Sequence, residues 1–139
     1  MKNHLFDSGS FISLIRKANP HIAADCLRES SVLNLTFYEV GNVVWKENCL
    51  TKTLSPTDAE TLQTMVPILL AVTNRITSEP EDFQKILEIA KKEKLTFYDS
   101  SYIYQAQKQG LTLVTEDKEL SAKGQKYVEV KSTSILLTQ

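Results

Sequence analysis

The sequence predicts an α/β fold, with a mostly parallel sheet of about five short strands and helices on both faces. Short apolar segments alternate along the chain with longer segments in which apolar residues recur every three or four positions. Helix caps and turns, such as Asn19-Pro20, Ser55-Pro56 and Gly110, separate these segments. Strands that alternate with helices are joined by right-handed crossovers, and such crossovers build a parallel sheet.

The first half of the chain is expected to contain two strands and four helices. A turn through Asp7, Ser8 and Gly9 should follow the first strand, and Thr36 is the expected N-cap of the third helix. The fourth helix is expected to bend or end near Pro67. The expected strands are residues 3–6 and 32–35, and the expected helices are residues 10–17, 21–29, 37–48 and 56–70.

The second half is expected to contain three strands and three helices. A helix-start signal at residues 78–81 precedes a stripe of apolar residues at helical spacing, and Gly110 is suited to end the next helix. A short helix is expected to follow Asp117. The expected strands are residues 74–77, 111–114 and 127–130, and the helix before Gly110 is expected at residues 98–109.

Composition favours one soluble globular domain spanning residues 1–139, with 42% apolar and 24% charged residues. The net charge of −1 argues against a broad nucleic-acid-binding surface, though a small site remains compatible with it. Cys26 and Cys49 lack the spacing of a zinc site, and a reducing cytoplasm is expected. The chain opens without the apolar region of a secretory signal, and its longest apolar stretch, residues 65–72, is too short for a membrane helix.

Four acidic residues, Asp7, Glu39, Asp99 and Asp117, fall at expected strand ends or in the first turns of expected helices. Parallel sheets place their sites at the carboxyl ends of the strands, so all four can lie on one rim. Gathered carboxylates repel one another, and a divalent cation such as Mg²⁺ or Mn²⁺ relieves that repulsion. Such an ion neutralises a phosphodiester and activates a water molecule to attack it.

Each acid also has a structural interpretation. Asp7 suits an Asx turn, Glu39 suits the positive end of a helix dipole, and Asp99 and Asp117 suit helix caps. Taken singly, these interpretations are favoured over a functional one.

The stretches FDSGSFISLI, LTFYEVGNVVWK and TFYDSSYIYQAQKQGLTLVTEDKEL carry these acids in series. In this order they resemble the PIN-domain ribonucleases, and most closely the small toxins of VapC type found in toxin–antitoxin pairs. The last stretch is similar to a family signature through Tyr98, Asp99, Tyr102, Ala106, Gly110, Leu111, Thr115, Asp117 and Leu120.

The resemblance implies a PIN-like fold in which Asp7, Glu39, Asp99 and Asp117 form a catalytic tetrad that binds one or two Mg²⁺ or Mn²⁺ ions. It implies an endoribonuclease, whose usual targets in the toxins are transfer RNA or ribosomal RNA. It also implies a homodimer and a small DNA-binding antitoxin as partner.

Supporting residues are chosen by their nearness to the acids. Thr115, Ser8 and Asn42 are candidates to hydrogen-bond the acids or their surroundings. Tyr98, Tyr102 and Tyr104 are able to stack bases, but their helical spacing favours packing. The candidates for RNA contact are the basic residues nearest the motifs, Arg16, Lys17, Lys46 and Lys118.

Two other functions stay open. One is an RNA-processing or quality-control nuclease of the same family, which a small upstream reading frame for a DNA-binding partner would argue against. The other is a binding module with the same fold and an idle site. The presence of all four acids argues against the idle site.

Overall fold

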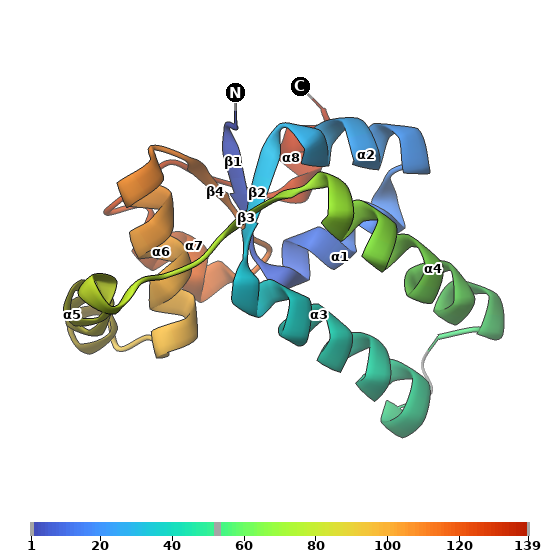
Figure 1. Cartoon of the computed structure of the whole chain (residues 1–139), viewed down its shortest axis with the longest axis horizontal. Helices are drawn as coiled ribbons and strands as arrows, with labels where there is room; N and C mark the ends of the chain where they lie inside the picture. The colour runs from blue at the N-terminus through green and yellow to red at the C-terminus, as the bar shows by residue number, and fades with distance from the viewer. Residues whose placement is uncertain (1, 52–53, 139) are drawn as a thin grey trace.

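A computed structural model describes residues 2–51 and 54–138. Within these residues five strands form one all-parallel sheet in the order β3-β2-β1-β4-β5 (Figure 1). This confirms the predicted fold class. The strands are β1 His4–Phe6, β2 Ser30–Leu33, β3 Asn74–Ile76, β4 Thr112–Val114 and β5 Val130–Lys131.

Helices cover both faces of the sheet, with α5, α6 and α7 on one side of it and the other helices on the opposite side (Figure 1). A π-helical turn, η1 Glu47–Thr51, extends α3, and a 3₁₀ turn, η2 Pro80–Asp82, precedes α5. The α-helices are α1 Ser8–Lys17, α2 Pro20–Arg28, α3 Asn34–Lys46, α4 Pro56–Val72, α5 Phe83–Glu93, α6 Phe97–Gln109, α7 Lys118–Gly124 and α8 Thr133–Leu137.

The alternation of side chains along each strand divides the core into two clusters. Phe6 packs with α1–α4, whereas its neighbour Leu5 packs with α5, α6 and α7. Val32 and Leu33 divide in the same way. Because successive strand residues point to opposite faces, strands of three or four residues serve both clusters.

The topology brings the acid-bearing segments to one edge of the sheet. β1 lies between β2 and β4, so the strand order reverses beside it, and parallel sheets bind ligands at such a switch point. α3 starts where β2 ends, and α6 runs back toward the start of β4. The N-terminal ends of α3 and α6 therefore lie at the carboxyl edge, with the ends of β1 and β4.

Two predicted boundaries near the acids are wrong. The expected turn at Asp7–Gly9 is the start of α1, because the Asp7 side chain accepts a hydrogen bond from the Ser10 backbone N–H and caps the helix. Thr36 is not an N-cap, since α3 begins at Asn34. Thr36 is fully buried inside the helix instead.

Other differences lie away from the acids. α4 passes through the exposed Pro67 and ends at Val72, because the buried residues Leu69 and Leu70 hold its last turn against the core. The last strand covers Val130–Lys131 rather than residues 127–130, and the short helix α8 after it was not expected. In the part of the chain that the structure describes, no helix is both long and apolar enough to cross a membrane.

Candidate functional site

The four acids lie at the carboxyl edge of the sheet, each on a different element. Asp7 follows β1, and Asp117 follows β4 and caps α7. Glu39 lies in the second turn of α3, one turn later than expected, and Asp99 lies in the first turn of α6. The charges of the other three acids all raise the pKa of Asp99, so the fold does gather them.

Asp7 is the most buried of the four, with 9% of its surface exposed. Its Oδ1 accepts the Ser10 N–H at 2.9 Å, and its Oδ2 accepts the hydroxyl of Thr115. Burial raises the pKa of Asp7, and the nearby charge of Glu39 raises it further, while the hydrogen bonds from Thr115 and Ser10 oppose the shift. The side chain is thus held firmly in a place that disfavours its charge.

Asp99 is half-buried, and its carboxylate lies close to the other three acids. Thr96, not Asp99, caps α6, and it does so by accepting the Asp99 backbone N–H at 3.1 Å. The Thr96 side chain also hydrogen-bonds the Asp99 carboxylate, which lowers the pKa of Asp99 and opposes the shift described next. Its pKa is raised first by burial and then by the charges of Asp117, Asp7 and Glu39. A carboxylate in such surroundings is suited to bind a cation.

Glu39 is held through one of its oxygens. Its Oε1 accepts the hydroxyl of Ser8 at 2.9 Å and the hydroxyl of Tyr102 at 2.8 Å. The Tyr102 hydroxyl is also 2.6 Å from the hydroxyl of Thr36. Three helices, α1, α3 and α6, therefore meet at this carboxylate.

Asp117 is the exposed member of the set. Its Oδ1 accepts the Leu120 N–H at 2.9 Å and so caps α7. Its own N–H donates to the Thr115 hydroxyl oxygen at 3.1 Å, and that hydroxyl donates to Asp7. Thr115 thus links two acids from the ends of β1 and β4. For Asp117 the capping interpretation is correct, whereas Asp7 caps α1 in place of the expected Asx turn; neither cap removes the acid from the site.

The donor set fits a hard divalent cation. Carboxylate oxygens are the ligands that Mg²⁺ and Mn²⁺ prefer, and these acids repel one another without a cation. Among the described residues, however, no group of three or more His, Cys, Asp or Glu side chains is close enough together to hold a metal ion. A cation would therefore have to draw the carboxylates closer.

The other predicted site residues divide by position. Ser8 and Thr115 each donate a hydrogen bond to one of the acids. Asn42 is exposed on α3, and its side chain makes no hydrogen bond with the described residues around it.

Of the basic residues predicted to contact RNA, only Lys118 is beside one of the four acids of the site, whereas Arg16 pairs with Glu47. Arg16 and Lys17 end α1, about 15 Å along the helix from Asp7, and Lys46 ends α3. A hollow of about 410 Å³ adjoins one of the four acids, Asp117, and is also lined by Thr115, Glu116, Lys118, Gln125, Ser132 and their neighbours.

Two residues that support Glu39 have roles other than those predicted from the sequence. Thr36 was expected to cap α3, and Tyr102 was interpreted as a packing residue. The signal that identifies them is spacing, because Thr36 precedes Glu39 by three residues and Tyr102 follows Asp99 by three. Residues three apart share a helix face, so the sequence places each hydroxyl on the same face as the acid of its own helix, though not in contact with Glu39 across helices.

Comparisons with known proteins identify the family and the fold. The family model described as PIN domain matches residues 5–126. A protein named Exonuclease VapC9, from Pyrobaculum aerophilum, is 36% identical over 107 residues, which are 77% of this chain and 76% of that protein.

Two solved structures extend the comparison. The crystal structure of PAE2754 from Pyrobaculum aerophilum has a TM-score of 0.80 and 28% identity, and the match covers 99% of this chain and 95% of that one. A toxin–antitoxin complex from Klebsiella pneumoniae contains a chain with a TM-score of 0.63 and 18% identity, with coverage of 94% and 98%. At that identity the second likeness concerns the fold alone.

Proposed function

Because this chain belongs to the PIN-domain family, we propose that it is a divalent-metal-dependent endoribonuclease and the toxin of a toxin–antitoxin pair. The observation that carries the proposal is the gathering of Asp7, Glu39, Asp99 and Asp117, in which three acids raise the pKa of the fourth. An array of mutually repelling carboxylates destabilises a protein unless it binds something positive.

Asp7, Glu39 and Asp99 would hold Mg²⁺ or Mn²⁺, and Asp117 would complete the site or a second one. When bound, the ion neutralises the charge of a phosphodiester and activates water for attack. The chain's own residues orient the acids. Thr115 fixes Asp7, and Ser8 fixes Glu39. No histidine or lysine is needed as a general base.

RNA is the proposed substrate, with transfer RNA or ribosomal RNA as the target. Lys118 and the hollow beside Asp117 are placed to contact a phosphate next to the acids. The relative from Pyrobaculum aerophilum is named an exonuclease. We favour internal cleavage for this chain because Asp117 lies on an exposed rim, where an internal phosphodiester reaches the acids as readily as a chain end.

The proposed partners are a second copy of the chain and a small DNA-binding antitoxin. α3 exposes large apolar side chains, with Phe37 53%, Tyr38 74% and Trp45 51% exposed, and such a surface is suited to a protein partner. A structural neighbour comes from a toxin–antitoxin complex. The cytoplasm is the proposed location, in keeping with two free cysteines.

The test uses purified chain, total cellular RNA and Mn²⁺, with mapping of new 5′ ends. A circular single-stranded RNA serves as a second substrate, because only internal cleavage opens a circle. We expect discrete cuts and opened circles from the wild-type chain, and neither in EDTA nor with Asp99→Asn. Asp25→Asn removes an exposed acid of α2 that pairs with Arg28, so it is the matched control and should cleave normally.

Two outcomes would contradict the proposal. Degradation of linear RNA with intact circles would identify an exonuclease. The absence of cleavage, together with the absence of Mn²⁺ binding, would favour the binding module with an idle site.

A further inference from the structure

Each of the helices α3 and α6 carries one acid of the site together with a buried hydroxyl one turn away. On α3 the pair is Thr36 and Glu39, and on α6 it is Asp99 and Tyr102. Thr36 is 0% exposed and Tyr102 is 1% exposed. The Tyr102 hydroxyl reaches across from the helix of Asp99 to the carboxylate of Glu39.

The donors in this contact follow from the chemistry of the groups. An ionised carboxylate only accepts hydrogen bonds, so the Tyr102 hydroxyl donates to Glu39 Oε1 at 2.8 Å. Having used its single proton, the Tyr102 oxygen accepts from the Thr36 hydroxyl at 2.6 Å. The hydrogen bonds therefore run in one direction, from Thr36 through Tyr102 to Glu39.

This arrangement fixes one oxygen of Glu39 and leaves the other available. The second bond to the carboxylate, from Ser8 at 2.9 Å, also ends on Oε1. Oε2 accepts no hydrogen bond from the residues that the structure describes. The hydrogen bond from Tyr102 to Glu39 also joins α6 to α3. Asp99 lies on α6 as well, and the charge of Glu39 raises its pKa. A single hydroxyl thus orients one acid and holds it near another of like charge.

We propose that Tyr102, with Thr36 behind it, is a positioning residue that holds Glu39 with its free oxygen turned toward a divalent cation shared with Asp99. The inference rests on the proposed function, because it assumes that these acids bind a cation. Tyr102 acts without contacting the ion. Loss of such outer support weakens metal binding by about 10-fold or more.

The test compares Mn²⁺ binding by Tyr102→Phe and by the wild-type chain, measured by titration calorimetry without RNA. The substitution removes only the hydroxyl, and we expect the Kd for Mn²⁺ to rise about 10-fold. Tyr104→Phe is the matched control. Tyr104 lies on the same helix, and its hydroxyl donates to the carboxylate of Asp82 at 3.0 Å, outside the site. Its loss should leave the Kd unchanged.

A double-mutant cycle separates positioning from a general structural role. If Tyr102 acts through Glu39, then Tyr102→Phe should have almost no further effect on the Kd in a Glu39→Gln background. Fully additive effects would overturn the proposal. So would a Tyr102→Phe protein with a lower melting temperature and unchanged Mn²⁺ affinity.

Two further measurements keep the outcomes distinct. If Tyr102→Phe does not fold, Thr36→Val tests the same chain of bonds, and we expect a smaller rise in Kd; an unchanged Kd would contradict the proposal. If the wild-type chain binds no Mn²⁺, or if Asp99→Asn binds it equally well, the proposed function fails. If the wild-type chain binds Mn²⁺ and Asp99→Asn does not, but Tyr102→Phe binds Mn²⁺ like the wild type, only the positioning role of Tyr102 fails.

Discussion

Both carboxylate oxygens of Asp7 are engaged, one by the first turn of α1 and one by Thr115. The first bond is a helix cap, and an asparagine oxygen makes such a bond as well as an aspartate oxygen. The charge of Asp7 is therefore not required for the cap. The raised pKa of Asp7 indicates that the folded protein disfavours its charge, and the proposed cation site would account for a charged residue at this position.

Asp99→Asn tests whether repulsion exists in the metal-free protein. The Asp99 carboxylate is half-exposed, so water screens its repulsion, and we expect the free energy of unfolding in EDTA to be unchanged or raised by up to about 1 kcal/mol. Urea denaturation measures it, with Asp25→Asn as control. A clear loss of stability would instead mark Asp99 as a structural residue.

The same repulsion has a defined dependence on pH. Because the pKa of Asp99 is raised in the folded state, the folded protein binds the proton more tightly than the unfolded chain does. The destabilisation is then present above the folded pKa and is relieved as the pH falls through it. Any increase in the free energy of unfolding caused by Asp99→Asn should accordingly be present at neutral pH and fade under acidic conditions.

The sequence identified the acids and two of their supports at the level of single residues. Ser8 and Thr115 were predictable because each is close in sequence to an acid. The contact between Tyr102 and Glu39 joins residues 63 positions apart. Its existence depends on how α3 and α6 pack, and no local pattern contains that information.

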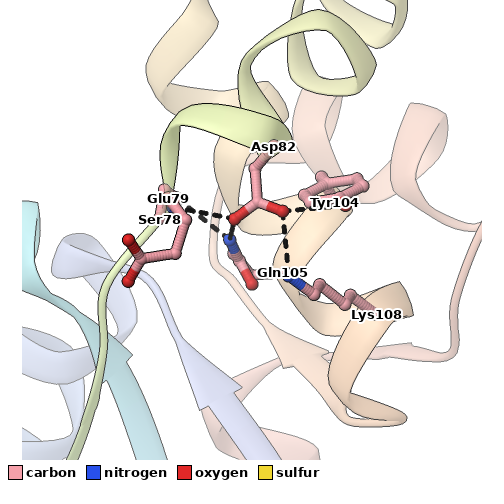
Figure 2. A network of polar contacts seen from close by, with 6 residues as sticks. All are labelled: Ser78, Glu79, Asp82, Tyr104, Gln105 and Lys108. Atoms are coloured by element: carbon pink, nitrogen blue, oxygen red, sulfur yellow. Dashed lines mark hydrogen bonds and ion pairs between the residues drawn. The ribbon is translucent and has the colours of Figure 1, made fainter.

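Among the elements, η2 and α5 are tied to α6 by the buried carboxylate of Asp82, which is 2% exposed (Figure 2). It accepts hydrogen bonds from the Glu79 N–H, the Tyr104 hydroxyl, the Gln105 amide and the Lys108 ammonium group. These bonds, the backbone one first, lower the pKa of Asp82. The donors on α6 are Tyr104, Gln105 and Lys108, in the C-terminal half of the helix, whereas Asp99 lies in its first turn.

Asp82→Ala should therefore lower the free energy of unfolding by about 1–3 kcal/mol, since it removes the acceptor of one buried and three part-buried hydrogen bonds. Denaturation in urea measures the change. Glu81→Ala is the matched control, because Glu81 is an exposed acid in the same 3₁₀ turn, and it should change stability by less than about 0.5 kcal/mol. Equal effects from the two substitutions would contradict the structural role of Asp82.

The pH dependence for Asp82 has the opposite sign from that for Asp99. A folded pKa below the ordinary value of 3.8 gives stability that is fully present above that value. That stability is lost as the pH falls below it and through the folded pKa. The difference in stability between the wild type and Asp82→Ala should consequently narrow in strong acid.

Elements with their own start and stop signals were predictable, whereas those defined by neighbours were not. Asn19 and Ser55 cap their helices, and Gly110 ends α6 in the left-handed conformation with φ of 68°. The start of α3 has no side-chain cap hydrogen bond, so its first turn was missed. β5 has two residues and is defined by its pairing with β4.

At the scale of the whole molecule, the order of the strands explains how distant acids meet. Phe6 and Val114 pair across β1 and β4, so the residues that follow each strand, including Asp7 and Asp117, are brought to the same edge. Alternation of strands and helices was enough to predict a parallel sheet and this edge. The sequence does not specify which strands are neighbours, and the sheet order β3-β2-β1-β4-β5 comes from the structure.

The distribution of charge over the whole molecule leads to a prediction about RNA affinity. The net charge is −1, and of the four candidate basic residues only Lys118 is next to one of the four acids of the site. Each phosphate contact with a single strand adds about 0.7 to the slope of log affinity against log salt. Since few contacts are available, we expect a slope of magnitude below about 2.

Fluorescence anisotropy with a short phosphorothioate RNA at fixed Mg²⁺ concentration measures that slope as KCl is varied. Lys118→Gln should reduce its magnitude by about 0.7, because one phosphate contact is lost. Lys46→Gln, at the far end of α3, is the matched control and should leave the slope unchanged. A steep slope that falls equally with either substitution would contradict this prediction, because it would mean that RNA lies across a broad basic surface away from the acids.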